Sequence, residues 1–416
     1  MPILSNPPGS LLLRSFRHRN FRLFFTGQFI SLTGTWMQSV AVSWLVYRLT
    51  GSSMALGLVG FASHIPVFLF GLFGGCLADR GNKRAILIAA QAAAMLQALT
   101  LAALTLSGTA NVWLVVSLAT FLGLVNAVDM PTRQAFVVDM VGREDLHNAI
   151  ALNSSMFNSA RVVGPALAGV LVAAIGEGWC FLVNGLSYLA VIAALAAMRL
   201  PPSQPSCGSG SVSGHVGQGL AYAWDDRPIR SILASLVVTS LFASSYMVLL
   251  PVVVNTVLGH GAQALGFLMA ATGVGSVLAA LLLALRQKSR GLSRWRIVSG
   301  LGVGLVMLAF AFSRTFWLSA FLSMILGFCL IFFFAASNTM LQLRSPDAMR
   351  GRIMALYSVT LVGMAPFGSL LAGAAASLLD APTTIALAGG LCVAGVALST
   401  VLDRKPGQEQ SASRPC

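Results

Sequence analysis

Long apolar stretches separated by short polar segments run along the whole chain. Twelve of them are long enough to cross a bilayer, because a spanning helix needs about 20 mostly apolar residues. Backbone amides in lipid must be paired within their own segment, and no stretch alternates as a barrel strand does, so we read all twelve as helices. The expected spans are 21–47, 54–78, 85–107, 111–131, 146–175, 178–198, 229–257, 262–285, 294–313, 315–342, 351–379 and 383–402.

Composition supports this interpretation. Hydrophobic residues make up 56% of the chain and charged residues only 9%. A water-soluble domain carries about 25% charged residues. The fold class is therefore all-α, a polytopic membrane protein, and we expect its function to lie inside the helix bundle.

Basic residues fall almost entirely on alternate loops. Of the 26 Lys and Arg residues, only Arg48 and Arg314 fall on the other set of loops, and Arg161 falls inside a span. The positive-inside rule then places both termini and the central segment in the cytoplasm, with the chain in the plasma (inner) membrane. Because topology accounts for the net charge of +14, we expect no nucleic-acid partner.

The two halves of the chain resemble each other. Gly57 and Gly266 each end an Ala-Leu-Gly triplet, 209 residues apart, and Gly169 and Gly373 match at an offset of 204 residues. Offsets near half the chain length predict two six-helix halves with substrate bound between them. The expected division is 1–200 for the first half, 201–228 for a cytoplasmic linker, 229–402 for the second half and 403–416 for a disordered tail.

The loop between the second and third spans carries a family resemblance. Residues 75–84 read Gly-Cys-Leu-Ala-Asp-Arg-Gly-Asn-Lys-Arg. This resembles the signature loop of the major facilitator superfamily, and it departs from the pattern at Asn82, where the family has a second Gly. Gly71 and Gly75 are spaced for close helix approach. The resemblance implies a gate that closes the cytoplasmic side, formed here by Gly75, Asp79, Arg80, Lys83, Arg84, Asp129 and Arg133.

Helix five carries a second resemblance. Residues 164–169, Gly-Pro-Ala-Leu-Ala-Gly, are similar to the Gly-Pro motif that the superfamily associates with exporters, with Gly164, Pro165 and Gly169 as its markers. Together with 129–135 and 158–161, this stretch resembles the transmembrane secretion effectors, a branch that includes enterobactin and macrolide exporters. Pro165 lacks an amide hydrogen, which predicts a local bend. The resemblance implies an exporter and not an enzyme.

Arg161 is the first candidate for contact with substrate, because an ionisable residue within a span is by default a functional-site hypothesis. At about 100° per residue, Ser154 and Asn158 share its helix face. Such a site favours an anionic or acceptor-rich molecule; the alternative is a structural tie to carbonyls or a carboxylate.

Polar stripes lie on helices that, by the resemblance, line the transport pathway. They extend the candidate cavity, although ordinary interhelical hydrogen bonding is the alternative for each. Their residues are Gln28, Ser31, Thr35, Gln38, Asn126, Ser235, Thr239, Tyr246, Asn338 and Gln342.

Candidates for a proton carrier are few. None of the twelve acidic residues is expected in the middle of a span. Asp129, near the cytoplasmic end of helix four, is either a salt-bridge partner in the gate or a proton carrier. His64 is either a buried neutral side chain or a proton relay. The histidines form no metal-ligand cluster and no phosphate-binding Gly-Lys-Ser/Thr motif occurs, so we expect neither a cofactor nor a metal.

These features predict a secondary active transporter that exports a small organic molecule, siderophore-like or drug-like, by alternating access. Proton coupling is implied by the resemblance alone. The alternatives are an uncoupled facilitator or a lipid flippase of the same fold. We expect the protein to act as a monomer in the bilayer.

Overall fold

The structure is a computed structural model that describes residues 14–199, 220–285 and 291–403. Within these ranges there are twelve helices long and apolar enough to span a membrane, and no strand. The expected tail and most of the expected linker lie outside the described residues, and residues 220–225 of that linker are helical.

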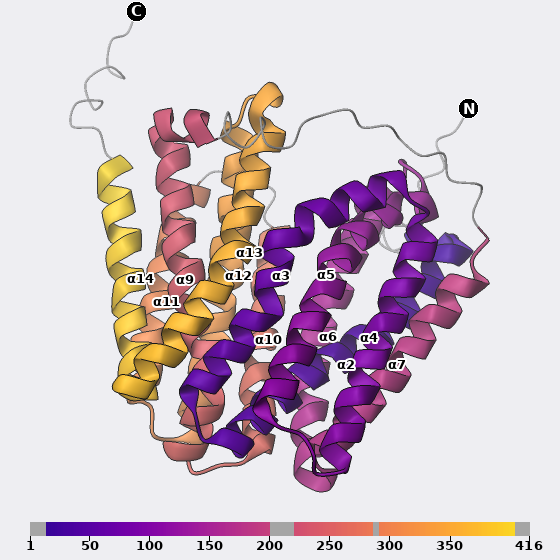
Figure 1. Cartoon of the computed structure of the whole chain (residues 1–416). Coiled ribbons are helices and arrows are strands. Elements are labelled where there is room, and N and C mark those ends of the chain that lie inside the picture. The colour runs from indigo at the N-terminus through magenta and orange to yellow at the C-terminus, as the bar shows by residue number, and fades with distance from the viewer. Residues whose placement is uncertain (1–13, 200–219, 286–290, 404–416) are drawn as a thin grey trace, which may run out of the picture.

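The described helices fall into two sets of six (Figure 1). The first set follows a short 3-10 helix, η1 (Arg14–Arg17), and consists of α2 (Arg19–Thr50), α3 (Ser53–Arg80), α4 (Lys83–Leu106), α5 (Val112–Val141), α6 (Leu146–Ile175) and α7 (Glu177–Ala197). The second set consists of α9 (Arg227–Thr256), α10 (Ala262–Leu285), α11 (Leu292–Phe312), α12 (Phe316–Arg344), α13 (Asp347–Leu378) and α14 (Ala381–Asp403).

The hydrophobic pattern located these helices closely, with one exception. All other expected boundaries lie within four residues of the observed ones. Helix α5 was expected to end at residue 131, but it continues through Pro131 to Val141. The apolar run stops where lipid contact is expected to stop, whereas the helix itself continues beyond it with charged residues such as Arg133 and Asp139.

Side chains at helix starts explain several of the boundaries. Asn82 is the N-cap of α4, and its side chain accepts a hydrogen bond from the Ala85 amide at 3.2 Å. The departure from the family pattern at this position therefore supplies a cap, which satisfies an amide that the helix leaves unpaired. Asn111 and Asp226 cap α5 and α9 in the same way.

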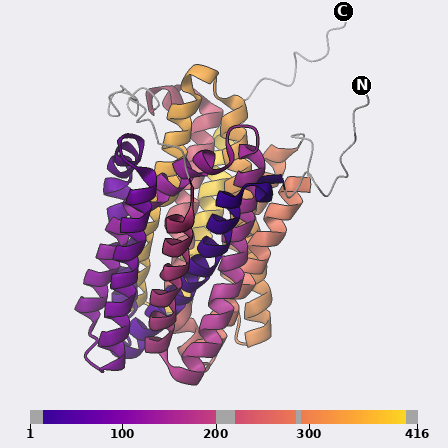
Figure 2. The same ribbon diagram turned by 90° about the vertical axis from the view of Figure 1, so that its right-hand side faces the viewer.

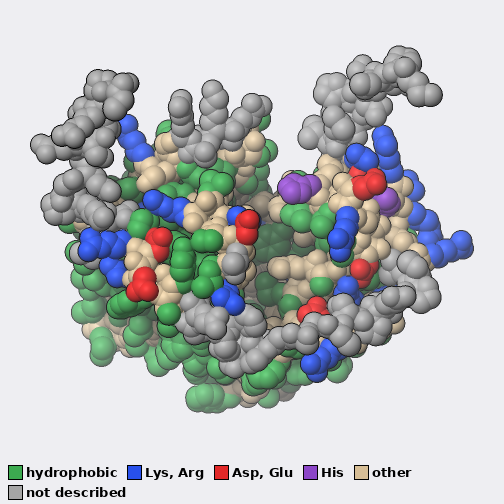
Figure 3. Space-filling model, turned by 90° about the horizontal axis from the view of Figure 1, so that it is seen from above, with side chains coloured by type: hydrophobic (Ala, Val, Ile, Leu, Met, Phe, Trp, Pro, Cys, Tyr) green, Lys and Arg blue, Asp and Glu red, His purple; other side chains and the backbone are tan. Residues whose placement is uncertain are grey.

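The two ends of the bundle differ in charge. At one end α2 begins at Arg19 and α3 ends at Arg80, and Lys and Arg side chains gather on this face (Figure 3). We call it the basic end. At the opposite end, Arg48 in the last turn of α2 pairs with Glu177 at the start of α7, with Nε and Oε1 2.8 Å apart.

Two glycine crossings join the halves near the opposite end. A Cβ on Gly57 of α3 would lie 2.7 Å from the Ser369 carbonyl and 2.9 Å from the Gly373 Cα of α13. A Cβ on Gly169 of α6 would lie 3.1 Å from the Gly266 Cα of α10. The internal repeat relates Gly57 to Gly266 and Gly169 to Gly373, so these crossings are symmetry-related.

The halves are apart at the basic end. Figure 3 shows a hollow between them on this face. Gly71 and Gly75, on the part of α3 nearest this end, have no atom within 4 Å of a Cβ added to them. The bundle is therefore closed at the opposite end and open at the basic end.

Candidate functional site

Arg161 lies where α6 meets helices of both halves. A Cβ on Gly164 would lie 2.6 Å from the Thr33 carbonyl of α2, and one on Gly273 of α10 would lie 2.8 Å from the carbonyl of Arg161 itself. Glycine on both sides lets the three backbones approach closely. The polypeptide therefore fixes Arg161 at the junction of the two halves.

The guanidinium of Arg161 rests on an aromatic platform. Its Cζ lies 5.5 Å from the centroid of the Trp36 ring, and that ring meets Phe157 edge-on at 5.7 Å. The residue is half-buried, and no carboxylate or other hydrogen-bond partner for its side chain occurs among the described residues. A cation held by an aromatic face keeps its hydrogen-bond donors available.

The expected polar face of α6 extends from Arg161 toward the basic end. Ser154 is exposed and Asn158 is half-buried, and the Asn158 amide donates to the Ser154 carbonyl at 2.9 Å. On the other half, Gln342 donates to Asn338 at 2.6 Å, with Asn338 half-buried and Gln342 exposed. These four side chains retain access from outside the helix core.

The polar stripe of α2 turns inward instead. Gln28, Ser31 and Gln38 are at most 4% exposed and lie inside the N-terminal half. Asn184 of α7 donates to Gln38 at 2.7 Å, and Gln38 donates to Gln97 of α4 at 3.0 Å. In this conformation Gln38 makes the interhelical hydrogen bonds that were the alternative to cavity lining, whereas Gln28, Ser31 and Thr35 line a small cavity inside the N-terminal half.

The stripe of α9 is buried in the same way. The Tyr246 hydroxyl donates to Ser323 at 2.7 Å, and Ser235 accepts from Arg296 at 2.8 Å. Thr239 is also fully buried. Arg296 falls inside the expected span 294–313, and in the structure it lies within α11 and is 2% exposed. Because Arg296 stands two positions after Arg294 in a basic stretch, nothing in the sequence indicates that its side chain faces the core.

A small polar cavity lies within the N-terminal half beside Asp129. It has a volume of about 40 Å³ and is lined by side chains of α2, α4, α5 and α7. Asp129 is 4% exposed; Gln91 of α4 donates to its Oδ1 at 2.7 Å, and Arg133 lies 3.5 Å from its Oδ2. Asn126, which is half-buried one turn away on α5, and Tyr188 of α7 also line the cavity. Asp129 lies twelve residues before the end of α5, deeper than its position in the apolar run indicated.

Where the structure describes both partners, the expected gate residues make no hydrogen bond or ion pair with the other half in this conformation. Asp79 and Arg80 are exposed. Lys83 pairs with Asp139 of α5 at 2.9 Å, and Arg84 donates to the Ala196 carbonyl of α7 at 2.6 Å, so both bind within their own half. The close helix approach expected at Gly71 and Gly75 occurs at Gly74, which packs against the Ala127 backbone of α5.

The helix-five motif joins α6 to two helices at once. Gly164 packs on α2, and Gly169 packs on α10. Pro165 stands inside a helix that runs unbroken from Leu146 to Ile175. The motif therefore ties the junction at Arg161 to the crossing that closes the opposite end.

His64 stands apart from these clusters. It is exposed, and its Nδ1 lies 2.9 Å from the Gly60 carbonyl of its own helix. No group of three or more His, Cys, Asp or Glu residues that could hold a metal occurs in the described part of the chain.

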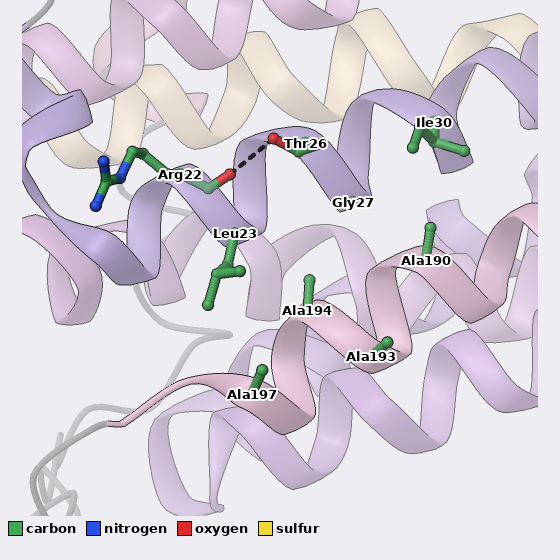
Figure 4. Close-up of a pocket in the computed structure, with 9 residues that line it drawn as sticks. All are labelled: Arg22, Leu23, Thr26, Gly27, Ile30, Ala190, Ala193, Ala194 and Ala197. Atoms are coloured by element: carbon green, nitrogen blue, oxygen red, sulfur yellow. Dashed lines mark hydrogen bonds between the residues drawn. The ribbon is translucent and has the colours of Figure 1, made fainter.

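A groove of about 460 Å³ lies between α2 and α7 (Figure 4). Both helices are visible on the outer face of the N-terminal half in Figure 2. Apart from Arg22 and Thr26, its lining consists of alanine, glycine, leucine and isoleucine. It offers few polar groups to a cargo molecule, and it lies away from the hollow between the halves.

Comparison with known proteins covers nearly the whole chain. A family model described as transmembrane secretion effector matches residues 12–415. A staphyloferrin A transporter of Staphylococcus aureus is 25% identical over 88% of this chain and 92% of its own. An enterobactin exporter of Shigella flexneri is 26% identical over 92% of each chain. The multidrug efflux pump Tap of Mycolicibacterium fortuitum is 25% identical over 82% of this chain and 85% of its own.

Solved structures share the architecture. A variant of the nucleoside transporter NupG gives a TM-score of 0.73 at 12% identity, covering 95% of this chain and all of that one. A POT family transporter in complex with 5-aminolevulinic acid gives 0.73 at 10% identity, covering 93% of this chain and 96% of that one. These likenesses confirm the expected twelve-helix fold.

Proposed function

Because the chain belongs to the transmembrane secretion effectors, a family of membrane transporters and not of enzymes, we propose that it exports a small, acceptor-rich organic molecule by alternating access. The observation that carries the proposal is Arg161: a half-buried guanidinium whose donors have no partner among the described residues, held on Trp36 where the halves meet.

The chemistry of that site favours an anionic or oxygen-rich cargo. A guanidinium binds carboxylate and other planar oxygen groups through paired hydrogen bonds. The aromatic pair of Trp36 and Phe157 adds an apolar surface beside it. Two of the relatives are named for siderophores, staphyloferrin A and enterobactin, and a cargo of that kind suits this combination.

The fold supports the transport cycle. The opposite end is closed by two glycine crossings while the basic end is open, which is one of the two states that alternating access requires. The positive-inside rule supports placing the basic end, and with it both termini, in the cytoplasm of the inner membrane. In that orientation the structure is open for cargo to enter from the cytoplasm. We take the transporting unit to be a monomer, coupled to the proton gradient.

Transport into inside-out membrane vesicles tests this function, with enterobactin and staphyloferrin A as the two probes. We expect uptake of at least one probe that stops when the pH gradient is collapsed. Uptake that continues unchanged after the collapse would make the protein an uncoupled facilitator. Uptake of neither probe would overturn the assignment of cargo.

Replacement of Arg161 tests the site. Arg161→Gln should lower uptake about tenfold to a hundredfold, because hydrogen bonds to a charged group contribute about 1.5–3 kcal/mol. Arg314→Gln, an exposed arginine between α11 and α12, is the matched control and should transport normally. The amount of each variant in the membrane is measured alongside. Wild-type uptake by Arg161→Gln would rule out the role in cargo binding.

A further inference from the structure

A buried carboxylate and an amide oxygen without a partner share the small cavity inside the N-terminal half. Asp129 and Gln91 are 4% and 6% exposed. Gln91 uses its Nε2 to donate to Asp129, and its Oε1 is buried with no hydrogen-bond partner among the described residues. Leaving a buried acceptor unsatisfied costs about 1–3 kcal/mol. The Gln91 Oε1 atom is therefore available to accept a hydrogen bond from a proton that binds in this cluster.

We propose that Asp129 is the proton-binding site of this transporter and that Gln91 is its positioning residue, which rests on the coupled transport proposed above. As described, Asp129 only accepts: Gln91 donates to one oxygen and Arg133 faces the other. This is the arrangement of an ionised carboxylate. When one proton from water binds, a new O–H bond forms on Asp129 and no other bond breaks. A half-turn of the Gln91 amide then presents Oε1 as its acceptor.

Few charged groups surround this carboxylate. Of the residues that line the cavity, only Asp129, Arg133 and Tyr188 can carry a charge. The wall from α2 is neutral, with Gln28, Ser31 and Thr35, and α4 contributes Gln91 and an alanine. Helix α3 packs on α5 near this level through Gly74, and none of its residues lines the cavity.

The next ion pair on α5 is too far away to replace Arg133 as a partner. Lys83 and Asp139 meet ten residues further along the helix, about 15 Å from Asp129 at 1.5 Å per residue. Protonation of Asp129 therefore changes the charge of the Asp129–Arg133 pair from zero to +1 with no nearby group to compensate. Such a change is well suited to bias a conformational equilibrium.

The site is separate from the place proposed for cargo. Arg161 lies on α6 at the junction of the halves, whereas Asp129 lies within the N-terminal half. On the far side of the cavity a row of polar side chains continues inside the same half. The Tyr188 hydroxyl lies 3.4 Å from Thr35, and Asn184 and Gln38 follow.

An apolar layer closes this polar row toward the opposite end. Leu45, Leu101 and Phe181 are each at most 1% exposed there. In this conformation Asp129 is shielded from the opposite end, and the bundle is open at the basic end. An ionised Asp129 in this state fits an exchanger that releases its proton to the side from which it takes up cargo.

Infrared difference spectroscopy of the purified full chain in lipid tests proton binding without any cargo. Acidification should produce the carbonyl band of a protonated carboxyl group in the wild type. The band should be lost in Asp129→Asn and kept in Asp139→Asn, a matched control on the same helix. Gln91→Leu should keep the band but shift its frequency, because the O–H loses its acceptor; a merely structural role for Gln91 would not move it.

Spin labels test whether that proton biases the conformation. We place them on the exposed Cys76 of α3 and on Gly351→Cys of α13, with the other cysteines replaced by alanine. The distance distribution should change on acidification in the wild type and in Asp139→Asn, and this response should be lost in Asp129→Asn.

Persistence of either the band or the distance response in Asp129→Asn would overturn the proposal. Both readouts work without cargo, so failure of enterobactin and staphyloferrin A to move in vesicles would contradict the proposed function and leave this result standing. Conversely, coupled transport by Asp129→Asn would locate the proton elsewhere while leaving export established.

Discussion

The role of a polar side chain in this bundle depends on the direction in which it points. Gln38 and Arg161 both lie on spanning helices and both were expected to contact cargo. Gln38 is 4% exposed and bonds Asn184 and Gln97, whereas Arg161 is only half-buried and rests on Trp36. The first therefore holds three helices together, and the second is available to a ligand.

Replacing Gln38 should separate these roles. Gln38→Leu leaves the amides of Asn184 and Gln97 buried without their partner, which should lower stability by about 1–3 kcal/mol. Thermal unfolding in detergent measures this loss. The KM for enterobactin should stay within about twofold of wild type; a large rise in KM at unchanged stability would return Gln38 to the cargo site.

At the scale of helices, glycine determines where the two halves can touch. Gly57 and Gly169 each bring two backbones closer than a Cβ would allow. Gly57 contacts Gly373, and Gly169 contacts Gly266, which are the equivalent positions in the repeat. The same pattern of small residues therefore forms both of the crossings that close the opposite end. The closed state therefore depends on the absence of a few methyl groups.

Adding one of these methyl groups should open the closed end. Gly57→Ala places a Cβ 2.7 Å from the Ser369 carbonyl. Because the contacted atoms belong to the backbone, only a shift of the backbone can relieve this clash. Overpacking of this kind costs about 1–3 kcal/mol. The ratio of basic-end-open to basic-end-closed molecules should fall about fivefold or more, measured with the Cys76 and Gly351→Cys label pair.

A glycine in open space provides the control for that experiment. Gly390 of α14 has no atom within 4 Å of an added Cβ. Gly390→Ala should leave the distance distribution as it is in the wild type. An unchanged distribution in Gly57→Ala as well would mean that this crossing does not hold the closed end.

The sequence predicted where the helices lie better than it predicted which neighbours their polar side chains contact. Length and apolarity fix a span, so 146–175 was exact. Gly169, named from the sequence only as a marker of the helix-five motif and of the repeat, lies at one of the crossings. The end of α5 was missed because a helix can continue after its lipid contact ends. Gln91, Gln97, Asn184 and Tyr188 were missed because a single polar residue in an apolar run does not show which neighbour it meets. Only the packing of α2, α4, α5 and α7 brings them together.

At the scale of the whole molecule, the structure represents one of the two states of the proposed transport cycle. The signature loop binds only within its own half among the described residues, and Asp79 is exposed. Its expected role as a gate requires the other state, in which the basic end closes. We therefore place its effect on the rate of interconversion and not on the binding of cargo.

Kinetics can distinguish these two effects. Asp79→Asn should lower kcat about fivefold, equivalent to about 1 kcal/mol in the barrier, with KM for enterobactin nearly unchanged. Initial rates of uptake over a range of enterobactin concentrations provide both constants. A raised KM at normal kcat would instead place Asp79 in the binding of cargo.

The location of the Asp129 cavity within a single half has a consequence for how such proteins diversify. Substitutions that reshape the hollow leave the residues around the carboxylate untouched. If Asp129 binds the proton as proposed, a lineage can acquire new cargo while it keeps its energy source, and the residues of the hollow should diverge faster among descendants than those around Asp129.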